Sequence, residues 1–268
     1  REGMKVVLAD VEEEALGLVE RGIGDEGAST LAVLTDVSKA DDVESLAKKT
    51  LDAFGAVHLL CNNAGVGTGL SVWESTLADW QWVIGVNLWG VIHGVHTFVP
   101  IMLEQGTECH IVNTASAAGL VSGPGQGIYK VTKHSVVSLS ETLFHELAMG
   151  GANVGVSVLC PGLIDTNILD CERNRPTELQ NDPAVQEAIE ASPEVQAFTQ
   201  AFRSALRQGM SPQQVADIVF NAVREKKFYI FANAEPFRAS IQARMEDIVQ
   251  ERNPIYVPIS PAGEPSDS

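Results

Sequence analysis

The sequence predicts an α/β fold in which helices cover both faces of a doubly wound, mostly parallel sheet. Short apolar runs alternate with longer amphipathic stretches, and this alternation continues to about residue 161. The 268 residues, 45% of them apolar, can bury a sizeable core. Right-handed crossovers place such strands in one sheet. We find neither an internal repeat nor a second core, so we expect one domain over residues 1–253.

The expected strands are continuous apolar runs, because a parallel sheet is buried on both faces. The expected helices carry apolar residues at helical spacing; Gly22 ends the first, and Ser38 caps the second. In chain order the elements are a strand at 4–9, a helix at 11–21, a strand at 30–35, a helix at 38–54, a strand at 57–62, a helix at about 77–104, a strand at 110–114, a helix at about 127–148 and a strand at 154–159.

The regular alternation ends after Pro161. Residues 163–210 are rich in polar helix formers, and we expect them to form a lid over the substrate. Ser211 and Pro212 are a good N-cap and first-turn pair for a further helix, which is followed by a strand at 228–231 and a charged helix at 235–252. The proline-bearing tail, residues 254–268, is expected to be flexible.

The charge balance argues against some partners. Lys and Arg number 18 against 35 Asp and Glu, and the net charge of −17 repels nucleic-acid phosphates and anionic lipid, so neither nucleic acid nor a membrane is expected as a partner. No apolar run approaches the roughly 20 residues that span a bilayer, and the N-terminus lacks the layout of a signal peptide. Four cysteines without a CxxC pair predict free thiols and a cytoplasmic location. His93 and His96 lack a third ligand at suitable spacing, so no metal site is expected.

Tyr129 and Lys133 are four residues apart on the predicted helix at 127–148. This spacing places both side chains on one face, about one turn apart. An ammonium near a phenol favours the phenolate, so Lys133 is expected to lower the Tyr129 pKa from about 10 toward the working range of a general acid or base. The pattern alone is weak, because a surface tyrosine and lysine at this spacing also occur by chance.

The two residues belong to an ordered set of motifs. Asn62-Asn63-Ala64-Gly65 closes one strand, Asn87 lies in the following helix, Ser116 follows the next strand, and Pro161-Gly162 closes a later one. Together with Tyr129 and Lys133 this order resembles the short-chain dehydrogenase/reductase family, whose members have a Rossmann-like fold. The resemblance covers residues 1 to about 232, and the ordered set is far more specific than any single motif.

The resemblance implies a division of catalytic roles. Tyr129 would exchange the proton, and Ser116 would hydrogen-bond the substrate oxygen. Lys133 would lower the tyrosine pKa and hold the nicotinamide ribose hydroxyls, while Asn87 would support a water that relays protons between Lys133 and solvent. The physical need is general: hydride moves between carbon centres, while the oxygen must exchange a proton and be stabilised as charge develops.

The resemblance also implies a nicotinamide dinucleotide cofactor. Asp10 ends the first strand, where a carboxylate accepts hydrogen bonds from both adenosine ribose hydroxyls and repels a 2′-phosphate, which favours NAD over NADP. An ordinary helix cap at Asp10 is the alternative. The cofactor-binding set implied by the resemblance is Asp10, Asp36, Val37, Asn63, Ala64, Gly65, Tyr129, Lys133, Pro161, Gly162, Ile164 and Thr166.

One part of the family pattern has no counterpart in this sequence. Members begin with a strand and a glycine-rich turn whose amides bind the pyrophosphate, and nothing here matches them. About thirty residues of a βαβ unit are expected to be absent, including a central strand between those at 4–9 and 57–62. Either the given sequence omits residues that the cell makes, or it is a fragment that cannot bind the dinucleotide normally; we favour the first.

We therefore expect an NAD-dependent oxidoreductase that interconverts a secondary alcohol and a ketone. The expected pocket walls, residues 66–72 and 117–126, are small and apolar, which suits an uncharged, fairly hydrophobic substrate. Arg173 and Arg175 in the lid keep an anionic group possible. A dinucleotide-sensing or structural relative without turnover is the alternative. A homodimer or homotetramer is expected, through the helices around Asn87 and Tyr129.

Overall fold

The strands form two parallel groups. The computed structural model describes residues 3–67, 71–184, 187 and 191–258. β1 (Val6–Asp10) pairs with β2 (Thr30–Leu34), and the second group has the order β3 (Leu59–Asn62), β4 (Cys109–Thr114), β5 (Val154–Pro161) and β6 (Tyr229–Ala232). Every strand pairing in this part of the chain is parallel, which confirms the predicted class of sheet.

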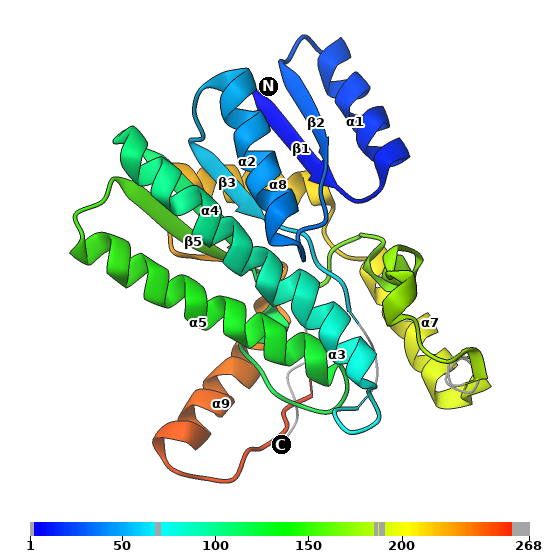
Figure 1. Cartoon of the computed structure of the whole chain (residues 1–268). Coiled ribbons are helices and arrows are strands. Elements are labelled where there is room, and N and C mark those ends of the chain that lie inside the picture. The colour runs from blue at the N-terminus through cyan, green and yellow to red at the C-terminus, as the bar shows by residue number, and fades with distance from the viewer. Residues whose placement is uncertain (1–2, 68–70, 185–186, 188–190, 259–268) are drawn as a thin grey trace.

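Helices cover both faces of the sheet (Figure 1). α2 (Ala40–Phe54), α4 (Gly90–Gln105) and α5 (Gly127–Met149) lie on the near face in this view, and α8 (Pro212–Arg224) lies behind it. The other longer helices are α1 (Glu13–Asp25), α3 (Leu77–Ile84), α7 (Pro193–Arg207) and α9 (Arg238–Val249). Short helical turns lie at Gly85–Trp89, Ala117–Gly119, Ile168–Asn174, Thr177–Leu179 and Glu235–Phe237.

Apolar side chains bury both faces of the larger strand group. On the near face Met102 of α4 packs in one cluster with Ile111 of β4, and both are fully buried. On the far face Ile230 of β6 packs with Ala222 of α8. Burial on both faces explains why these strands read as continuous apolar runs, and each large side chain removed from water contributes about 1.5–3 kcal/mol.

β1 and β3 are not joined by strand pairing within the described residues. Val6 faces Thr30 across the β1–β2 pair, and Leu59 faces His110 across the β3–β4 pair. The other edge of β1 and the other edge of β3 therefore have no ladder partner in this part of the chain. This is the position at which the sequence leads us to expect one more strand.

The segment after β5 leaves the sheet and returns to its starting point. Ile164 forms a parallel bridge with Met210, and the Met210 amide donates a 3.1 Å hydrogen bond to the Leu163 carbonyl oxygen. The predicted lid, residues 163–210, is therefore closed at its base; residues 185–186 and 188–190 lie outside the described residues. The first residues of the predicted tail, 254–258, contact α9, and residues 259–268 are not described.

One helical run differs from the sequence-based expectation. Leu77–Gln105 comprises α3, a π-helical turn and α4. Within the described residues it is long and apolar enough to cross a membrane by length and composition alone, with a mean hydropathy of 1.3 in an 18-residue window. The run contacts α2, α5 and β3. A core helix of a folded protein meets the same criterion, which makes this weak support for a membrane span.

Candidate active site

Tyr129 and Lys133 lie together on the first two turns of α5. The Lys133 Nζ is 5.5 Å from the centroid of the Tyr129 ring, so the two side chains share one face of the helix. The start of α5 is tightly held, because a Cβ atom on Gly127 would overlap the side chain of Val72. This close approach determines where the first turn, and with it Tyr129, can lie.

Lys133 is buried beside the end of β4. Its ammonium donates a 2.8 Å hydrogen bond to the carbonyl oxygen of Thr114. Burial lowers the pKa of Lys133 to about 8, because desolvation disfavours the charged form. A Cβ atom on Gly65 would lie 3.5 Å from both the Lys133 Nζ and the Asn87 Oδ1, so the three residues meet at one point.

Asn87 lies in the π-helical turn Gly85–Trp89, between α3 and α4. Its Nδ2 donates to the Val66 carbonyl oxygen and its Oδ1 accepts from the Val66 amide, both at 2.8 Å. Nδ2 also donates to the Thr132 hydroxyl at 3.2 Å. The fully buried side chain thus ties the segment after β3 to α5. Such π turns inside helices are frequent at functional sites.

The Ser116 hydroxyl lies close enough to the Tyr129 phenol to lower the pKa of the phenol, and it also donates a 3.4 Å hydrogen bond to the Pro161 carbonyl oxygen. Ser116 follows β4 and accepts a 3.1 Å hydrogen bond from the Ala118 amide, which caps the short turn Ala117–Gly119. The sequence places the two residues thirteen positions apart, and β4 and α5 bring their side chains to one point. One substrate oxygen could therefore contact both hydroxyls.

The sign of the Tyr129 pKa shift differs from the sequence-based expectation, which was wrong. Burial raises the pKa of Tyr129 above its ordinary value of 10; the hydrogen bond with Ser116 lowers it, and the nearby Cys171 raises it. Lys133 is not among the groups that shift this pKa, although its Nζ lies 5.5 Å from the centroid of the ring. In this structure the phenol is held in its protonated form.

The expected cofactor residues lie at the carboxyl ends of the strands. Parallel strands bring these ends to one edge of the sheet, where open α/β sheets bind ligands. Asp10 ends β1, and its Oδ1 accepts a 3.0 Å hydrogen bond from the Glu12 amide. Because Glu12 is the N-cap of α1 and no side chain caps this helix, Asp10 is not its cap residue. Asn63, Ala64 and Gly65 follow β3, and the Asn63 Oδ1 accepts a hydrogen bond from Thr114.

Asp36 and Val37 follow β2 and are engaged locally. Burial raises the pKa of Asp36, but hydrogen bonds from Ser38 and the ion pair with Lys39 outweigh it and lower the pKa below the ordinary value. The Val37 carbonyl oxygen lies 2.9 Å from the His93 Nδ1. Both residues therefore lie at the carboxyl end of β2. The Asp36 carboxylate is already bound by Ser38 and Lys39 in the turn before α2.

Pro161, Gly162, Ile164 and Thr166 leave the end of β5 together. A Cβ atom on Gly162 would overlap the backbone of Asn233, so only glycine fits where the two segments meet. Ile164 is half-buried at the base of the lid, and Thr166 is exposed. These four residues lie at the same edge of the larger strand group as Asn63, because β3, β4 and β5 pair in parallel.

Both lid arginines already have carboxylate partners. Arg175 is buried, forms a 2.8 Å ion pair with Asp79, and lies over the Trp82 ring. Arg173 forms an ion pair with Glu12 at 2.5 Å. Because both cations are neutralised, the structure weakens the sequence-based suggestion that they bind an anionic substrate group.

Sequence reasoning missed the contact of the lid with the segment after β3. The Cys171 thiol donates to the Gly67 carbonyl oxygen at 3.3 Å and accepts from the Gly67 amide at 3.4 Å. A Cβ atom on Gly67 would lie 3.4 Å from the Tyr129 ring, so Cys171 borders the site. No local signal in the sequence could have found it, because Gly67 and Cys171 are 104 residues apart. Of the expected pocket wall 66–72, residues 68–70 lie outside the described residues.

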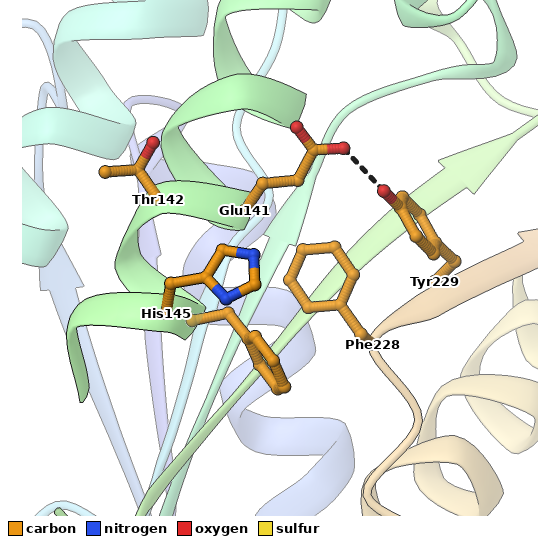
Figure 2. A pocket seen from close by; sticks show the side chains of 6 residues that line it. Glu141, Thr142, His145, Phe228 and Tyr229 are labelled. Atoms are coloured by element: carbon orange, nitrogen blue, oxygen red, sulfur yellow. Dashed lines mark hydrogen bonds between the residues drawn. The ribbon is translucent and has the colours of Figure 1, made fainter. Parts of the chain in front are cut away.

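A different surface hollow lies between α5 and β6 (Figure 2). It is lined by Glu141, Thr142, Phe144, His145, Phe228 and Tyr229. The Tyr229 hydroxyl points to the Glu141 carboxylate and donates a hydrogen bond to it. Burial, strengthened by this carboxylate, raises the pKa of Tyr229 to about 12. Tyr229 is therefore a second tyrosine with a raised pKa that lies outside the candidate site, and it can be compared with Tyr129 in experiments.

Comparison with known families and curated proteins gives a consistent result. The family model described as short chain dehydrogenase matches residues 1–177. A dehydrogenase/reductase of CLA biosynthesis from Lactiplantibacillus plantarum is 32% identical over 254 residues, covering 94% of this chain and 87% of that protein. A 1-deoxy-11-beta-hydroxypentalenate dehydrogenase from Streptomyces exfoliatus is 31% identical, covering 92% of this chain and 80% of its own length.

A solved structure is similar over nearly the whole chain. A short-chain dehydrogenase/reductase from Burkholderia phymatum, in complex with NAD, is 47% identical with a TM-score of 0.89. The match covers 96% of this chain and 89% of that one. The parallel sheet, its flanking helices and the grouped strand ends are thus found in a protein that binds a nicotinamide dinucleotide.

Proposed function

This chain belongs to the short-chain dehydrogenase/reductase family of oxidoreductases, and we propose that it is an NAD-dependent enzyme that interconverts a secondary alcohol and a ketone. The observation that carries the proposal is the cluster of Ser116, Tyr129 and Lys133, in which two hydroxyls meet beside a buried ammonium. Two donors aimed at one oxygen suit the reduction of a carbonyl group.

The residues at the strand ends fit a nicotinamide dinucleotide. Among the described residues Lys133 hydrogen-bonds Thr114 alone, which leaves two of its three N–H donors for ribose hydroxyls. Asp10 offers a carboxylate at the end of β1, where the adenosine ribose would lie, and its charge disfavours a 2′-phosphate. When bound, the nicotinamide supplies or accepts the hydride.

The protein's own part is proton exchange at one oxygen. In the reductive direction the protonated Tyr129 phenol donates its proton to the substrate oxygen, while the Ser116 hydroxyl stabilises the charge that develops there. The raised pKa of Tyr129 keeps the phenol protonated at neutral pH, as a proton donor requires. The Lys133 ammonium, with its pKa near 8, can return a proton to the phenolate, and Asn87 lies beside it to support a water relay.

The walls of the site favour an uncharged, fairly hydrophobic substrate. Val66 and Gly67 lie on one side, and Cys171 contacts Gly67 from the lid. Arg173 and Arg175 are neutralised by carboxylates, so neither offers a free cation to an anionic substrate. Apolar pockets with few polar groups bind such molecules by desolvation.

The pyrophosphate cradle would come from outside the given sequence. The unpaired edges of β1 and β3 support a further parallel strand between them, and its turn would present backbone amides to the phosphates. Measuring the intact mass of the natural product tests this part. A dinucleotide-sensing relative without turnover is the alternative that applies if the cradle is never made.

Assembly and location are also part of the proposal. Exposed apolar side chains on α4 and α5, among them Leu103, Val131 and Met149, support a homodimer or homotetramer formed through these helices. The four cysteines are free, as predicted, which supports a reducing, cytoplasmic compartment.

The test compares two tyrosine variants of the natural full-length protein. Tyr129→Phe should reduce alcohol-dependent NADH formation by about 10²–10⁴-fold with NAD binding retained, because the general base that takes up the alcohol proton in this direction is lost. Tyr229→Phe removes the same atom outside the site and should leave the rate unchanged. A parent protein that binds NAD but oxidises none of a panel of secondary alcohols would favour the sensing alternative.

A further inference from the structure

The loop at residues 122–126, called the pocket loop below, connects the region of Ser116 to α5. The Lys130 ammonium lies among three successive carbonyl oxygens of this loop and donates to Gly123 at 2.9 Å, Pro124 at 3.0 Å and Gly125 at 2.7 Å. A lysine ammonium has three N–H donors, so the loop uses all of them. Lys130 therefore holds the pocket loop from the α5 side.

The chain after α9 folds back along that helix as a strap, residues 254–258 (Figure 1). The Ile255 amide donates a 2.9 Å hydrogen bond to Asp247 near the end of α9. The Ser240 hydroxyl, in the first turn of α9, donates to the Val257 carbonyl oxygen at 3.2 Å. Asp247 and Ser240 are both buried, so the strap is anchored at two points along the helix.

The strap brings Tyr256 onto the pocket loop. A Cβ atom on Gly123 would lie 2.7 Å from two carbon atoms of the Tyr256 ring, so the ring is seated directly on the glycine backbone. Any larger residue at position 123 would displace it. The pocket loop is thus held from two sides, by Lys130 through hydrogen bonds and by Tyr256 through an apolar contact.

We propose that the strap is a releasable clamp on the substrate pocket, and that Tyr256 determines how large a substrate the enzyme accepts. The inference rests on the proposed function, in which residues 117–126 form one wall of the substrate pocket. Releasing the ring contact removes the apolar restraint on Gly123, while the three hydrogen bonds from Lys130 to the loop remain. The pocket then widens without disturbing Tyr129.

The effect on selectivity is tested with Tyr256→Ala and Gly123→Ala, and with Tyr256→Phe as the matched control that keeps the ring. In both disrupting variants the kcat/KM for a bulky secondary alcohol, relative to that for 2-propanol, should rise about five-fold or more, as a change in pocket size allows. Tyr256→Phe should keep the parent ratio, and the Kd for NAD should stay the same in all three. An unchanged ratio in Tyr256→Ala overturns the proposal.

A measurement without turnover separates this inference from the proposed function. Hydrogen–deuterium exchange of the amides at 119–128 should become faster in Tyr256→Ala and Gly123→Ala, and it should match the parent in Tyr256→Phe. Equal exchange in all variants overturns the clamp, whether or not the enzyme is active. If the two disrupting variants exchange faster than the parent but the parent oxidises no alcohol, the clamp stands and the proposed function is refuted. The role of Tyr256 in selecting alcohols is then refuted as well.

Discussion

The Arg175 guanidinium forms a 2.8 Å ion pair with the Asp79 carboxylate, and both side chains are only 2% exposed. Asp79 lies on α3 and Arg175 follows the turn Ile168–Asn174, so the pair ties the beginning of the lid to the helix before Asn87. Asn181 donates a further hydrogen bond to Asp79 at 2.9 Å. The first part of the predicted lid is therefore held against α3.

Breaking this buried pair should be costly. Asp79→Ala leaves the Arg175 cation buried without its partner and should reduce the free energy of unfolding by about 3–5 kcal/mol, measured by urea denaturation. Asp170→Ala removes an exposed pair with Arg203, which solvent screens, and should cost far less. A similar cost for both variants would contradict the prediction, whereas Asp79→Leu combined with Arg175→Met should recover most of the loss.

The Asp79 carboxylate should also contribute to acid sensitivity. Burial raises the pKa of Asp79, but hydrogen bonds from Thr76, Asn181 and Arg175 outweigh it and lower the pKa below 3.8. A lowered folded-state pKa means that the stabilisation is present above the unfolded value of about 3.9 and is lost as the pH falls through the folded value. The difference in unfolding free energy between the parent and Asp79→Asn should thus shrink as the pH falls below the unfolded-state pKa of about 3.9.

Lys133 should lower the free energy of unfolding of the protein when no cofactor is bound. Its folded-state pKa of about 8 lies below the ordinary 10.5, so the unfolded chain binds more protons between these values. Stability from this group therefore rises from pH 8 to 10.5, and the buried charge opposes folding below pH 8. Lys133→Met should raise the free energy of unfolding at pH 7 by about 1–3 kcal/mol while abolishing turnover.

Urea denaturation of Lys133→Met at pH 7 and at pH 9.5 checks this prediction, and the gain should be smaller at the higher pH. Lys49→Met, at an exposed position on α2, is the matched control and should change stability little at either pH. A destabilised Lys133→Met would show that the Thr114 hydrogen bond outweighs the desolvation of the ammonium.

Asp10 should control the choice between NAD and NADP. Asp10→Ser removes the carboxylate at the end of β1 and should raise the Kd for NAD about ten-fold or more, because hydrogen bonds to a charged group are lost. NADP should bind more tightly to the same variant, since the repulsion of its 2′-phosphate is gone. Glu13→Gln removes an equal charge from the first turn of α1 and is the control. Titration of the full-length protein with each dinucleotide measures both effects; a parent that prefers NADP would refute the assignment.

Two glycines in helices should respond oppositely to alanine. A Cβ atom on Gly94 of α4 would overlap the Asn62 side chain, which donates a 2.8 Å hydrogen bond to the buried Asn113. Gly94→Ala should therefore destabilise the protein by about 1–3 kcal/mol, as overpacking does. Gly22→Ala, on α1 with nothing within 4 Å, should stabilise by about 0.5–1 kcal/mol. Thermal unfolding of both variants provides the comparison.

Local patterns in the sequence were enough for the fold class and for the site's rough position. The alternation of apolar runs and amphipathic stretches predicted the parallel strands, and strand ends must meet at one edge, so Asp10, Asn63 and Ser116 could be grouped without a structure. The spacing of Tyr129 and Lys133 placed them on one helix face for the same reason, since helical periodicity is local. The π turn at Asn87 was not predicted, because its residues have ordinary helical periodicity.

Tertiary structure alone decided how these groups are charged and which residues border them. The pKa of Tyr129 rises instead of falling because the fold buries the phenol and brings Cys171, which is distant in sequence, close enough to raise the pKa further. Arg173 reaches Glu12 across 161 residues, and Tyr256 reaches Gly123 from the far end of the chain. A sequence determines local periodicity and the order of strands, whereas desolvation and long-range contacts depend on which side chains the fold packs together.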